Sequence, residues 1–282
     1  MVGDAGERSI SQWSIQSSDI IQEILETQKP GATIAPIILS SDKTQVTVFG
    51  NKNAYLVYMT IGNIPKSLQR KPKKHAQILV AYLPTTKLNH ITNKASCRRT
   101  MINLFHACIH RVVTPLETSG VEGMPMSSGD GVVRHVHPIL ALYVADYPEQ
   151  VLVTGVKTGE CPKCPIPHDD LGTNEDQYPL RDIEATLDAL ALADEDPTQF
   201  VQACAAIGIK PIYHPFWQNL PYVDIFQSVT PDILHQLLQG VLKHVIAWLK
   251  AAFGPAEIDA RCRRFPPNHN VQIFEQGITS LT

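Results

Sequence analysis

The sequence predicts an α/β fold, and three observations support this. Strand-like segments rich in β-branched and aromatic residues, some alternating with period two, follow one another early in the chain: "TIAPIILSS", "TQVTVF" and "NAYLVYMTIG". Later segments change to helical spacing with Pro and Gly at their ends. A hydrophobic content of 44% over 282 residues is enough for a sizeable core. We therefore expect strands first and mainly helices after them.

The early strand segments are closely spaced, which is typical of an antiparallel meander. "FGNKNAYL" supplies turn residues between the second and the third segment. A dense basic stretch from Lys66 to Lys74 comes next, and "ILVAYLP" then returns to strand character. The basic stretch has two interpretations, a solvated loop or a contact with DNA phosphates.

A helix and a further strand follow the meander. "NKASCRRTMINLFHACIHRVVTPLETSG" places apolar residues at helical spacing, and we expect Gly120 to end this helix. His106 and His110 lie four residues apart on it, a spacing that can bind metal. With no carboxylate between them and an apolar face nearby, we interpret them as structural. "VVRHVHPILALYVADYPEQ" then predicts a strand that breaks at Asp146.

The remainder of the chain is mainly helical. "LRDIEATLDALALADEDPTQFVQACAAIG" predicts two helices with a break marked by proline, and "SDIIQEILET" predicts a short helix near the N-terminus. We expect Thr230 and Pro231 to start a strong helix, with Thr230 as its N-cap. Five aromatic residues before it are expected to pack under a loop rather than to stack on bases: Tyr213, Phe216, Trp217, Tyr222 and Phe226.

This order of elements suits an RNase H-like core with a mainly helical insertion after the later acidic strand. Such a core performs metal-assisted phosphodiester chemistry when acidic residues stand on the first strand and just after the fourth. Asp42 lies at the end of the first strand segment and Asp146 ends the later strand. Mg²⁺ and Mn²⁺ prefer oxygen ligands, so these two residues are the candidate metal ligands, although a lone Asp there is also typical of a turn.

The stretch "TGECPKCPIPHDDLG" contains a close pair of cysteines, Cys161 and Cys164. In a reducing compartment such a pair is expected to bind metal or to perform redox chemistry. A redox pair is favoured at the start of a helix, and the surrounding prolines oppose a helix here. We therefore predict a structural Zn²⁺ site with Cys161, Cys164 and His235 as ligands, against the alternative of two free cysteines. The fourth ligand is open between His168, His214 and His244.

Charge and hydropathy patterns narrow the class of protein. The formal net charge of −3 supplies no global attraction to a polyanion, so contacts with nucleic acid would depend on local patches. No run of about eighteen apolar residues is present, and the first thirty residues lack the pattern of a signal peptide. We therefore expect an intracellular protein without a membrane partner.

Long phrases of the sequence resemble a known family. "SSDKTQVTVFGNKNAYLVYMTIGNIPKSLQRKP", "VAYLPTTKL", "DGVVRHVHPILALYVADYPEQVLVTGVKTGECPKC" and "YVDIFQSVTPDILHQLLQGVLKHVIAWL" are similar to the Plavaka transposases. These are a fungal branch of the Kyakuja, Dileera and Zisupton DNA transposons. The resemblance runs from about Ile34 to the C-terminus.

The resemblance implies an RNase H-like transposase with three acidic residues that bind Mg²⁺ or Mn²⁺. Asp42 matches the first acidic position and Asp146 is the best match for the second, with Asp130 as its rival. The third, a Glu on a late helix, is expected beyond residue 282, because the acidic residues near the end match no family phrase: Glu257, Asp259 and Glu275.

The expected activity is metal-dependent cleavage and transfer of DNA strands at transposon ends, in the nucleus, with DNA ends, target DNA and further copies of the chain as partners. The alternative is an inactive, truncated remnant that binds DNA or a protein, and the enzyme assignment stays open because the third acidic residue is not identified. We divide the chain into a partly disordered lead-in (1–33), the first part of the core (34–160), and the cysteine loop with an incomplete helical insertion (161–282).

Overall fold

The computed structural model describes residues 29–47, 52–170 and 178–264. The chain divides into two compact units, Met1–Thr230 and Pro231–Thr282, and each is described by itself. The helix predicted at "SDIIQEILET" lies outside the described residues. The boundaries that we predicted at residues 33 and 160 stay predictions.

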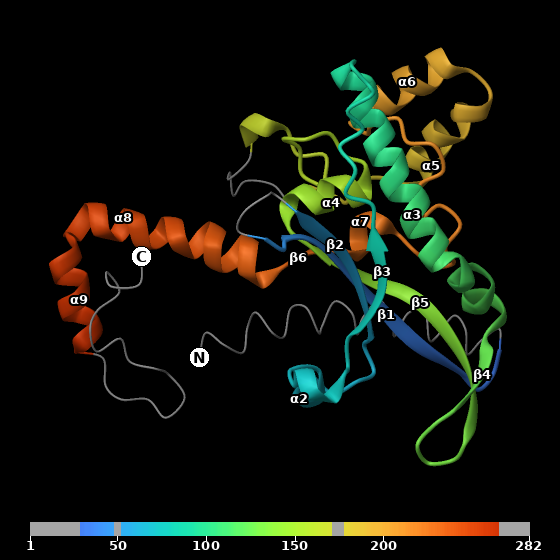
Figure 1. Ribbon diagram of the computed structural model, residues 1–282, viewed down its shortest axis with the longest axis horizontal. Coiled ribbons are helices and arrows are strands. Elements are labelled where there is room, and N and C mark those ends of the chain that lie inside the picture. Colours follow the sequence, from blue (N-terminus) through green and yellow to red (C-terminus); the bar gives the residue numbers. More distant parts are fainter. Residues whose placement is uncertain (1–28, 48–51, 171–177, 265–282) are drawn as a thin grey trace. The chain divides into compact units, whose positions relative to one another are not determined.

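A mixed β-sheet forms the centre of the first unit (Figure 1). Its strand order is β3-β2-β1-β5-β4, and a further short strand, β6, pairs with β5. The strands have the following bounds: β1 (Ala32–Gln45), β2 (Asn53–Ile61), β3 (Ile78–Leu83), β4 (Met124–Ser127), β5 (Val133–Ala145) and β6 (Val229–Pro231). The antiparallel pairs β1–β2 and β2–β3 form a meander, whereas β5 lies parallel to β1.

The meander differs from the prediction in its first strand. The segments "TIAPIILSS" and "TQVTVF" were expected to be two strands, but a single strand, β1, runs from Ala32 to Gln45. The polar residues of "SSDKT" do not interrupt it because they remain paired with β2, with Asp42 opposite Leu56 and Gln45 opposite Asn53. The third strand of the meander is therefore β3, which lies beyond the basic stretch.

Helices and short helical turns make up most of the remaining structure. In the first unit they are α2 (Lys66–Gln69), η1 (Pro72–Lys74), α3 (Lys94–Glu122), α4 (Tyr147–Thr154), η2 (His168–Asp170), α5 (Ile183–Ala191), η3 (Leu192–Asp194), α6 (Pro197–Ala206) and α7 (Ile225–Ser228). In the second unit they are the π-helix η4 (Ile233–Leu242), α8 (Lys243–Phe253) and α9 (Pro255–Arg263). The Pro-marked break between α5 and α6 is as predicted, and Asp182 and Asp196 cap the two helices.

The long helix α3 does not end at Gly120, contrary to the prediction. It continues to Glu122 and ends at Gly123, whose φ of +76° is in the left-handed region. Gly120 has a packing role instead, because a Cβ atom there would lie 2.5 Å from Cγ of Pro221 and 3.2 Å from the carbonyl oxygen of Pro138. A missing side chain thus permits the close approach of the helix to neighbouring backbone.

The start of the late helix also differs from the prediction, which had Thr230 as N-cap. Thr230 and Pro231 belong to β6, and the cap is Asp232, whose side chain accepts a hydrogen bond from the backbone N–H of His235. Thr230 is two residues before the cap position, so it is not placed to accept from the amides of the first helical turn.

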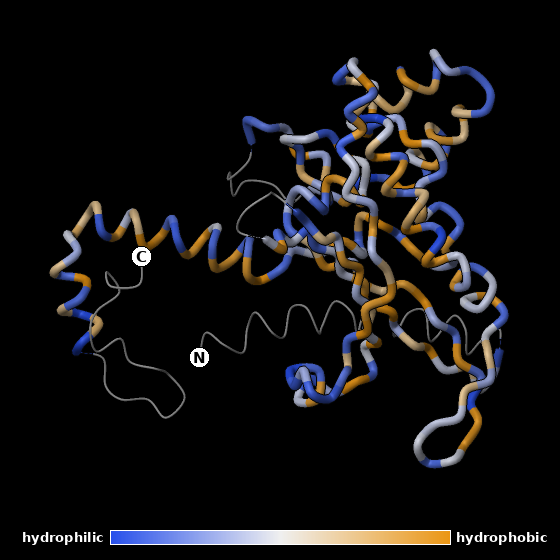
Figure 2. The backbone as a smooth tube through the Cα atoms, viewed as in Figure 1, coloured by the Kyte–Doolittle hydropathy of each residue, from blue (hydrophilic) through white to orange (hydrophobic). Residues whose placement is uncertain are grey.

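The main hydrophobic core lies between the sheet and the helices of the first unit. Along β1, Ile37 and Leu39 alternate into this core, and from α3 Phe105 and Ile109 are buried against the strands. Figure 2 shows the hydrophobic residues along the strands at the centre of this unit. Phe216, Trp217 and Phe226 are buried in the same core, whereas Tyr213 and Tyr222 are exposed. Packing is thus confirmed for three members of the predicted aromatic cluster.

His106 is a core residue, as expected for a structural histidine. Its side chain is fully buried, with Nε2 3.0 Å from the carbonyl oxygen of Leu152 and Nδ1 accepting from the backbone N–H of Phe216. His110 pairs with Glu117 at 3.0 Å on the same helix. The two histidines thus bond to different partners, although they lie four residues apart on the helix.

Within the part of the chain that the structure describes, no helix combines the length and the apolar character needed to cross a bilayer.

His106 predicts a pH dependence of stability. Burial lowers the pKa of its imidazole to about 3, with a further lowering by the nearby Lys210 ammonium and an opposing effect of the hydrogen bond to Leu152. Below pH 6.5 His106 is protonated in the unfolded chain but stays neutral in the folded chain. The free energy of unfolding therefore falls as the pH falls. Each pH unit between about 6.5 and 3 costs the wild type about 1.4 kcal/mol, or about 2 kcal/mol by pH 5.

Urea unfolding of the wild type and of His106→Gln between pH 7 and pH 5 measures this effect. The free energy of unfolding of the wild type should fall more steeply with decreasing pH than that of the variant. Equal slopes for the two proteins would contradict the buried, neutral state of His106.

Candidate functional site

Asp42 and Asp146 lie at the same edge of the sheet. β1 and β5 pair in parallel up to Ser40 and Val144, and each aspartate follows two residues later in its chain. Because parallel strands place their carboxyl ends at one edge, this register brings together two residues that are 104 positions apart (146 minus 42). The structure therefore places both predicted metal ligands two residues beyond the last pair of β1 and β5, with Asp42 still within β1 and Asp146 directly after β5.

The two aspartates have different surroundings. Asp42 is exposed, and its carboxylate accepts a hydrogen bond from the hydroxyl of Thr44. Asp146 is half-buried and is the N-cap of α4, where its Oδ1 accepts from the backbone N–H of Glu149 at 3.0 Å. Pro148 and Glu149 in the first turn of α4 suit this position, because proline needs no amide partner and acidic side chains are stabilised there.

Glu149 is a site residue that the sequence analysis missed. Its Oε1 accepts hydrogen bonds from the hydroxyl of Ser41 on β1 and, at 2.5 Å, from the hydroxyl of Tyr55 on β2. Ser41 is also 2.7 Å from the hydroxyl of Tyr143 on β5. The available signal was the D-x-x-E spacing of Asp146 and Glu149, which resembles the pattern at the start of a capped helix.

Burial sets the electrostatics of this network. It raises the pKa of the Glu149 carboxyl, the hydrogen bonds from Ser41 and Tyr55 oppose this, and the charges of Asp146 and Asp42 raise the pKa further. Burial and the Glu149 charge likewise raise the pKa values of Tyr55 and Tyr143. The phenols therefore stay protonated and act as donors near the two aspartates.

Asp130, the rival for the second acidic position, lies elsewhere. It sits in the turn before β5, at the opposite end of that strand from Asp146. Arg134 donates two hydrogen bonds to its carboxylate, at 3.0 and 2.7 Å, and these bonds hold the pKa of Asp130 well below its usual range. This geometry is that of an exposed turn stabilised by a local ion pair.

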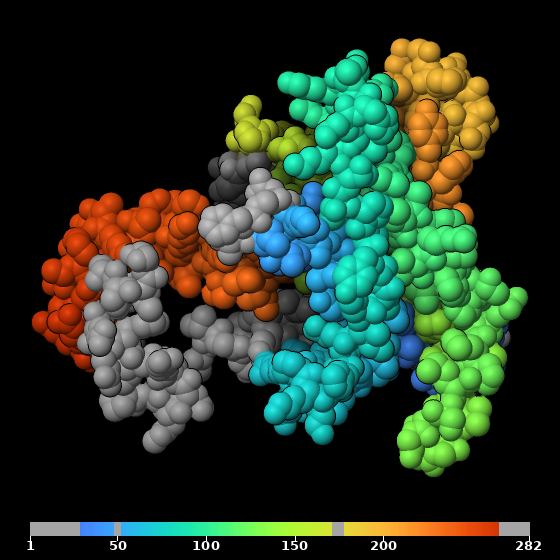
Figure 3. Space-filling view, in the orientation of Figure 1, coloured from blue at the N-terminus to red at the C-terminus, as the bar shows by residue number. Residues whose placement is uncertain are grey.

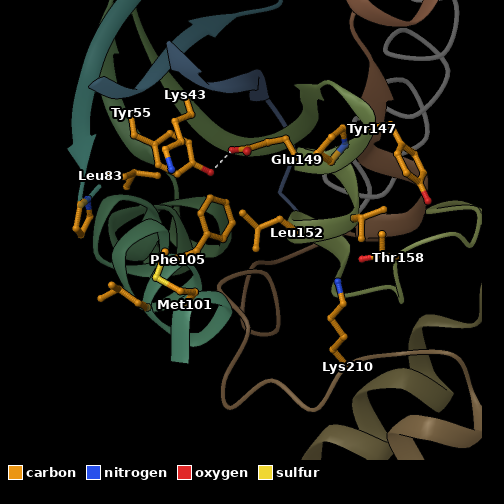
Figure 4. Close-up of a pocket in the computed structure, with 14 residues that line it drawn as sticks. Lys43, Tyr55, Leu83, Met101, Phe105, Tyr147, Glu149, Leu152, Thr158 and Lys210 are labelled. Carbon is orange, nitrogen blue, oxygen red and sulfur yellow. Dashed lines mark hydrogen bonds between the residues drawn. The ribbon is translucent and has the colours of Figure 1, made fainter. Parts of the chain in front are cut away.

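A cavity of about 380 Å³ adjoins the acidic edge (Figure 4). Its walls come from the ends of β1, β2 and β3 and from α3 and α4, and Glu149 contributes to it. The remaining lining residues are Lys43, Tyr55, Leu83, Pro84, Met101, Leu104, Phe105, Tyr147, Pro148, Val151, Leu152, Thr158 and Lys210. This volume is in the range of small-molecule sites, about 300 to 1,000 Å³.

The cysteine loop places Cys161 and Cys164 face to face. Their Sγ atoms are 3.4 Å apart, compared with about 2.05 Å in a disulfide, and both cysteines are free. The backbone N–H of Lys163 points to Sγ of Cys161 at 3.5 Å. Burial raises the pKa of Cys164, so this thiol is not activated for redox chemistry.

Arg181 anchors this loop to the rest of the first unit. The side chain is only 7% exposed, and it donates to the carbonyl oxygens of Cys161 and Ile207 and to Glu160, the last at 2.8 Å. The Lys163 ammonium also connects the loop to this unit, because it donates hydrogen bonds to the carbonyl oxygens of Gln227 and Val229. The loop is therefore ordered by direct contacts of its own.

The histidines predicted to complete a Zn²⁺ site are spread over both units. His168 starts η2, and His214 lies 3.9 Å from Asp194. His235 and His244 belong to the second unit, where Nδ1 of His235 is 2.9 Å from Asp232 and His244 packs against Trp248. Among the described residues, no group of three or more His, Cys, Asp or Glu side chains is arranged to hold a metal ion.

The basic stretch from Lys66 to Lys74 forms α2 and η1, and its Lys and Arg side chains are exposed. It lies on the surface of the first unit in the space-filling view (Figure 3). A solvated segment and a contact with DNA phosphates both remain compatible with this position.

The hydrogen bond from Tyr55 to Glu149 is predicted to stabilise the fold. Tyr55→Phe removes a buried donor to a carboxyl group and should lower the free energy of unfolding by about 1 to 3 kcal/mol. Tyr58→Phe is the matched control, because Tyr58 is on the same strand and its hydroxyl makes no hydrogen bond within the described residues. The control should change stability by less than about 0.5 kcal/mol.

Urea unfolding at pH 7 compares the two variants. An equal loss of unfolding free energy in the two variants would contradict the prediction, because it would mean that the Tyr55–Glu149 hydrogen bond does not stabilise the fold.

The comparison with known families gives one match. A family model described as Plavaka transposase matches residues 4–249. A search of curated proteins finds no relative of the chain.

Proposed function

The chain belongs to the Plavaka transposase family, and from this we propose that it cleaves and transfers DNA strands at transposon ends in a metal-dependent reaction. The observation that supports the proposal best is the position of Asp42 and Asp146, each two residues beyond the last pair of the parallel strands β1 and β5. The family match covers both residues.

We propose further that the sheet is an RNase H-like core. Three features support this: the antiparallel order β3-β2-β1, the parallel pairing of β5 beside β1, and the helix α3 between β3 and β5 in the chain. In such a core the first acidic residue belongs to the first strand and the second follows the strand next to it, as Asp42 and Asp146 do.

The residues present fit a hard divalent cation. Asp42 and Asp146 offer carboxylate oxygens, which Mg²⁺ and Mn²⁺ prefer, and Asp42 is open to solvent. When bound, such an ion would activate an attacking oxygen and stabilise the leaving one. The protein itself orients Asp146 through the N–H of Glu149 and holds the end of β1 through Ser41.

Glu149 is not offered as the third acidic ligand. Its Oε1 is engaged by Ser41 and Tyr55, and burial raises the pKa of its carboxyl group. The third acidic residue that the family resemblance implies is not assigned to a described residue of this chain.

We also propose a structural Zn²⁺ held by Cys161 and Cys164; His235 as third ligand, and a fourth from His168, His214 or His244, stay predictions from the sequence. The facing thiols and the N–H directed at Cys161 support the cysteine half of the site. Partners and location follow from the family: DNA ends and target DNA, further copies of the chain, and the nucleus.

Nicking of DNA tests the catalytic proposal. In Mg²⁺ or Mn²⁺, the protein should nick a supercoiled plasmid that carries the DNA flanking its own coding sequence. Asp42→Asn and Asp146→Asn should each reduce the rate about a hundred-fold or more, because each removes a charged ligand. Asn retains the ability to cap α4, so the second variant should fold.

Asp130→Asn is the matched control and should leave nicking unchanged, because Asp130 lies in a turn at the other end of β5. Nicking that persists in Asp42→Asn would refute the proposal. DNA binding without any nicking would support the alternative function, a DNA-binding protein that catalyses nothing.

Elemental analysis tests the Zn²⁺ proposal. The purified protein should contain about one zinc per chain, and Cys161→Ser or Cys164→Ser should lose it together with thermal stability. Cys97→Ser is the control, because Cys97 lies at the start of α3 away from the cysteine loop. Absence of zinc, with thermal stability unaltered in Cys161→Ser, would refute the site.

A further inference from the structure

The cavity beside the acidic edge has the size and chemistry of a ligand site. Its volume is about 380 Å³, and it lies wholly within the first unit. Glu149 in its wall donates its backbone N–H to Oδ1 of Asp146, and its carboxyl group lies within electrostatic range of both Asp146 and Asp42. A molecule in this cavity would therefore be close to the proposed catalytic residues.

The walls of the cavity suit a flat apolar group. Tyr55 and Phe105 are stacked, with ring centroids 6.1 Å apart and an interplanar angle of 23°. Leu83, Met101 and Leu104 extend this apolar wall. Aromatic and apolar side chains of this kind bind the faces of nucleobases without regard to sequence.

Lys210 supplies a positive charge without a partner. Its ammonium group is half-buried, and no acceptor among the described residues lies within hydrogen-bond distance of it. Burial lowers the pKa of Lys210, which shows that this position costs the charged form some of its hydration. An anionic group of a ligand would restore the lost interactions.

Glu149 supplies a free acceptor on the other side. Ser41 and Tyr55 both bond to Oε1, and Oε2 has no hydrogen bond within the described residues. Figure 4 shows Glu149 and Lys210 on either side of Leu152. A ligand that spans the cavity could thus place N–H groups near Glu149 and an anion near Lys210.

We propose that this cavity binds one unpaired nucleotide of a DNA strand, with its base on the wall of Tyr55 and Phe105 and its phosphate at Lys210. Amino groups of cytosine, adenine or guanine are suited to Oε2 of Glu149, whereas thymine has no such group. The inference rests on the proposed function for the identity of the ligand as DNA.

Fluorescence anisotropy tests this in buffer without Mg²⁺ or Mn²⁺, where no cleavage occurs. The probes are a labelled blunt duplex and the same duplex with a single-stranded overhang of three cytosines or three thymines. The wild type should bind the cytosine overhang about five-fold or more tightly than the blunt duplex, and the thymine overhang less tightly than the cytosine one.

Two variants probe the cavity itself. Lys210→Gln removes the charge, and Leu104→Trp fills the space; each should abolish the preference for the overhang. Lys87→Gln is the matched control, because Lys87 is exposed and does not line the cavity, and it should retain the preference. Thermal melting of all variants identifies any that fail to fold, and one folded cavity variant is sufficient for the comparison.

The outcomes separate this inference from the proposed function. Equal binding of the blunt and overhang duplexes, together with metal-dependent nicking, would overturn the inference alone. A preference that survives in a folded Lys210→Gln or Leu104→Trp variant would overturn it as well. Binding of neither duplex would overturn it together with the function on DNA. An overhang preference that depends on the cavity but occurs without nicking would support it while removing the catalytic proposal.

Discussion

The parallel pairing of β1 with β5 is the interaction on which the candidate site depends. It places the carboxyl ends of both strands at one edge and sets a register in which Asp42 and Asp146 follow neighbouring paired residues. A parallel connection requires a long crossover, and α3 provides it between β3 and β5. The acidic edge is thus a product of topology, and neither aspartate would form a site without the other strand beside it.

A hydrogen-bond network centred on Glu149 stabilises this edge of the sheet. Glu149 accepts hydrogen bonds from β1 and β2 through Ser41 and Tyr55, while its backbone N–H orients Asp146. One residue at the start of α4 therefore connects two strands, a helix and one of the proposed ligands. Burial raises the pKa values of Tyr55 and Tyr143, so these phenols stay protonated and bring hydrogen-bond donors to the edge.

The cavity shares its structural elements with this network. Tyr55 and Glu149 belong both to the cavity wall and to the hydrogen-bond network. Lys210, which also lines the cavity, interacts electrostatically with the buried His106. A substitution in the cavity will therefore alter both packing and electrostatics, as residues in contact are seldom independent. By contrast, the cysteine loop is held by Arg181 and Lys163 and has no residue in common with the cavity.

The sequence by itself determined the succession of strands and helices, the break at Asp146, the two candidate aspartates and the family, because these depend on local pattern and on long phrases of residues. It could not show that "SSDKT" continues β1, that Gly120 packs rather than ends a helix, or that Asp232 replaces Thr230 as a cap, since pairing partners and close approaches lie far away in the chain. Only the tertiary structure decided that Glu149 lies beside Asp42 and Asp146 and that Lys210 lines the adjoining cavity. The physical reason is that hydrogen bonding and burial at this edge join residues from four separate segments, and no local pattern records which segments will meet.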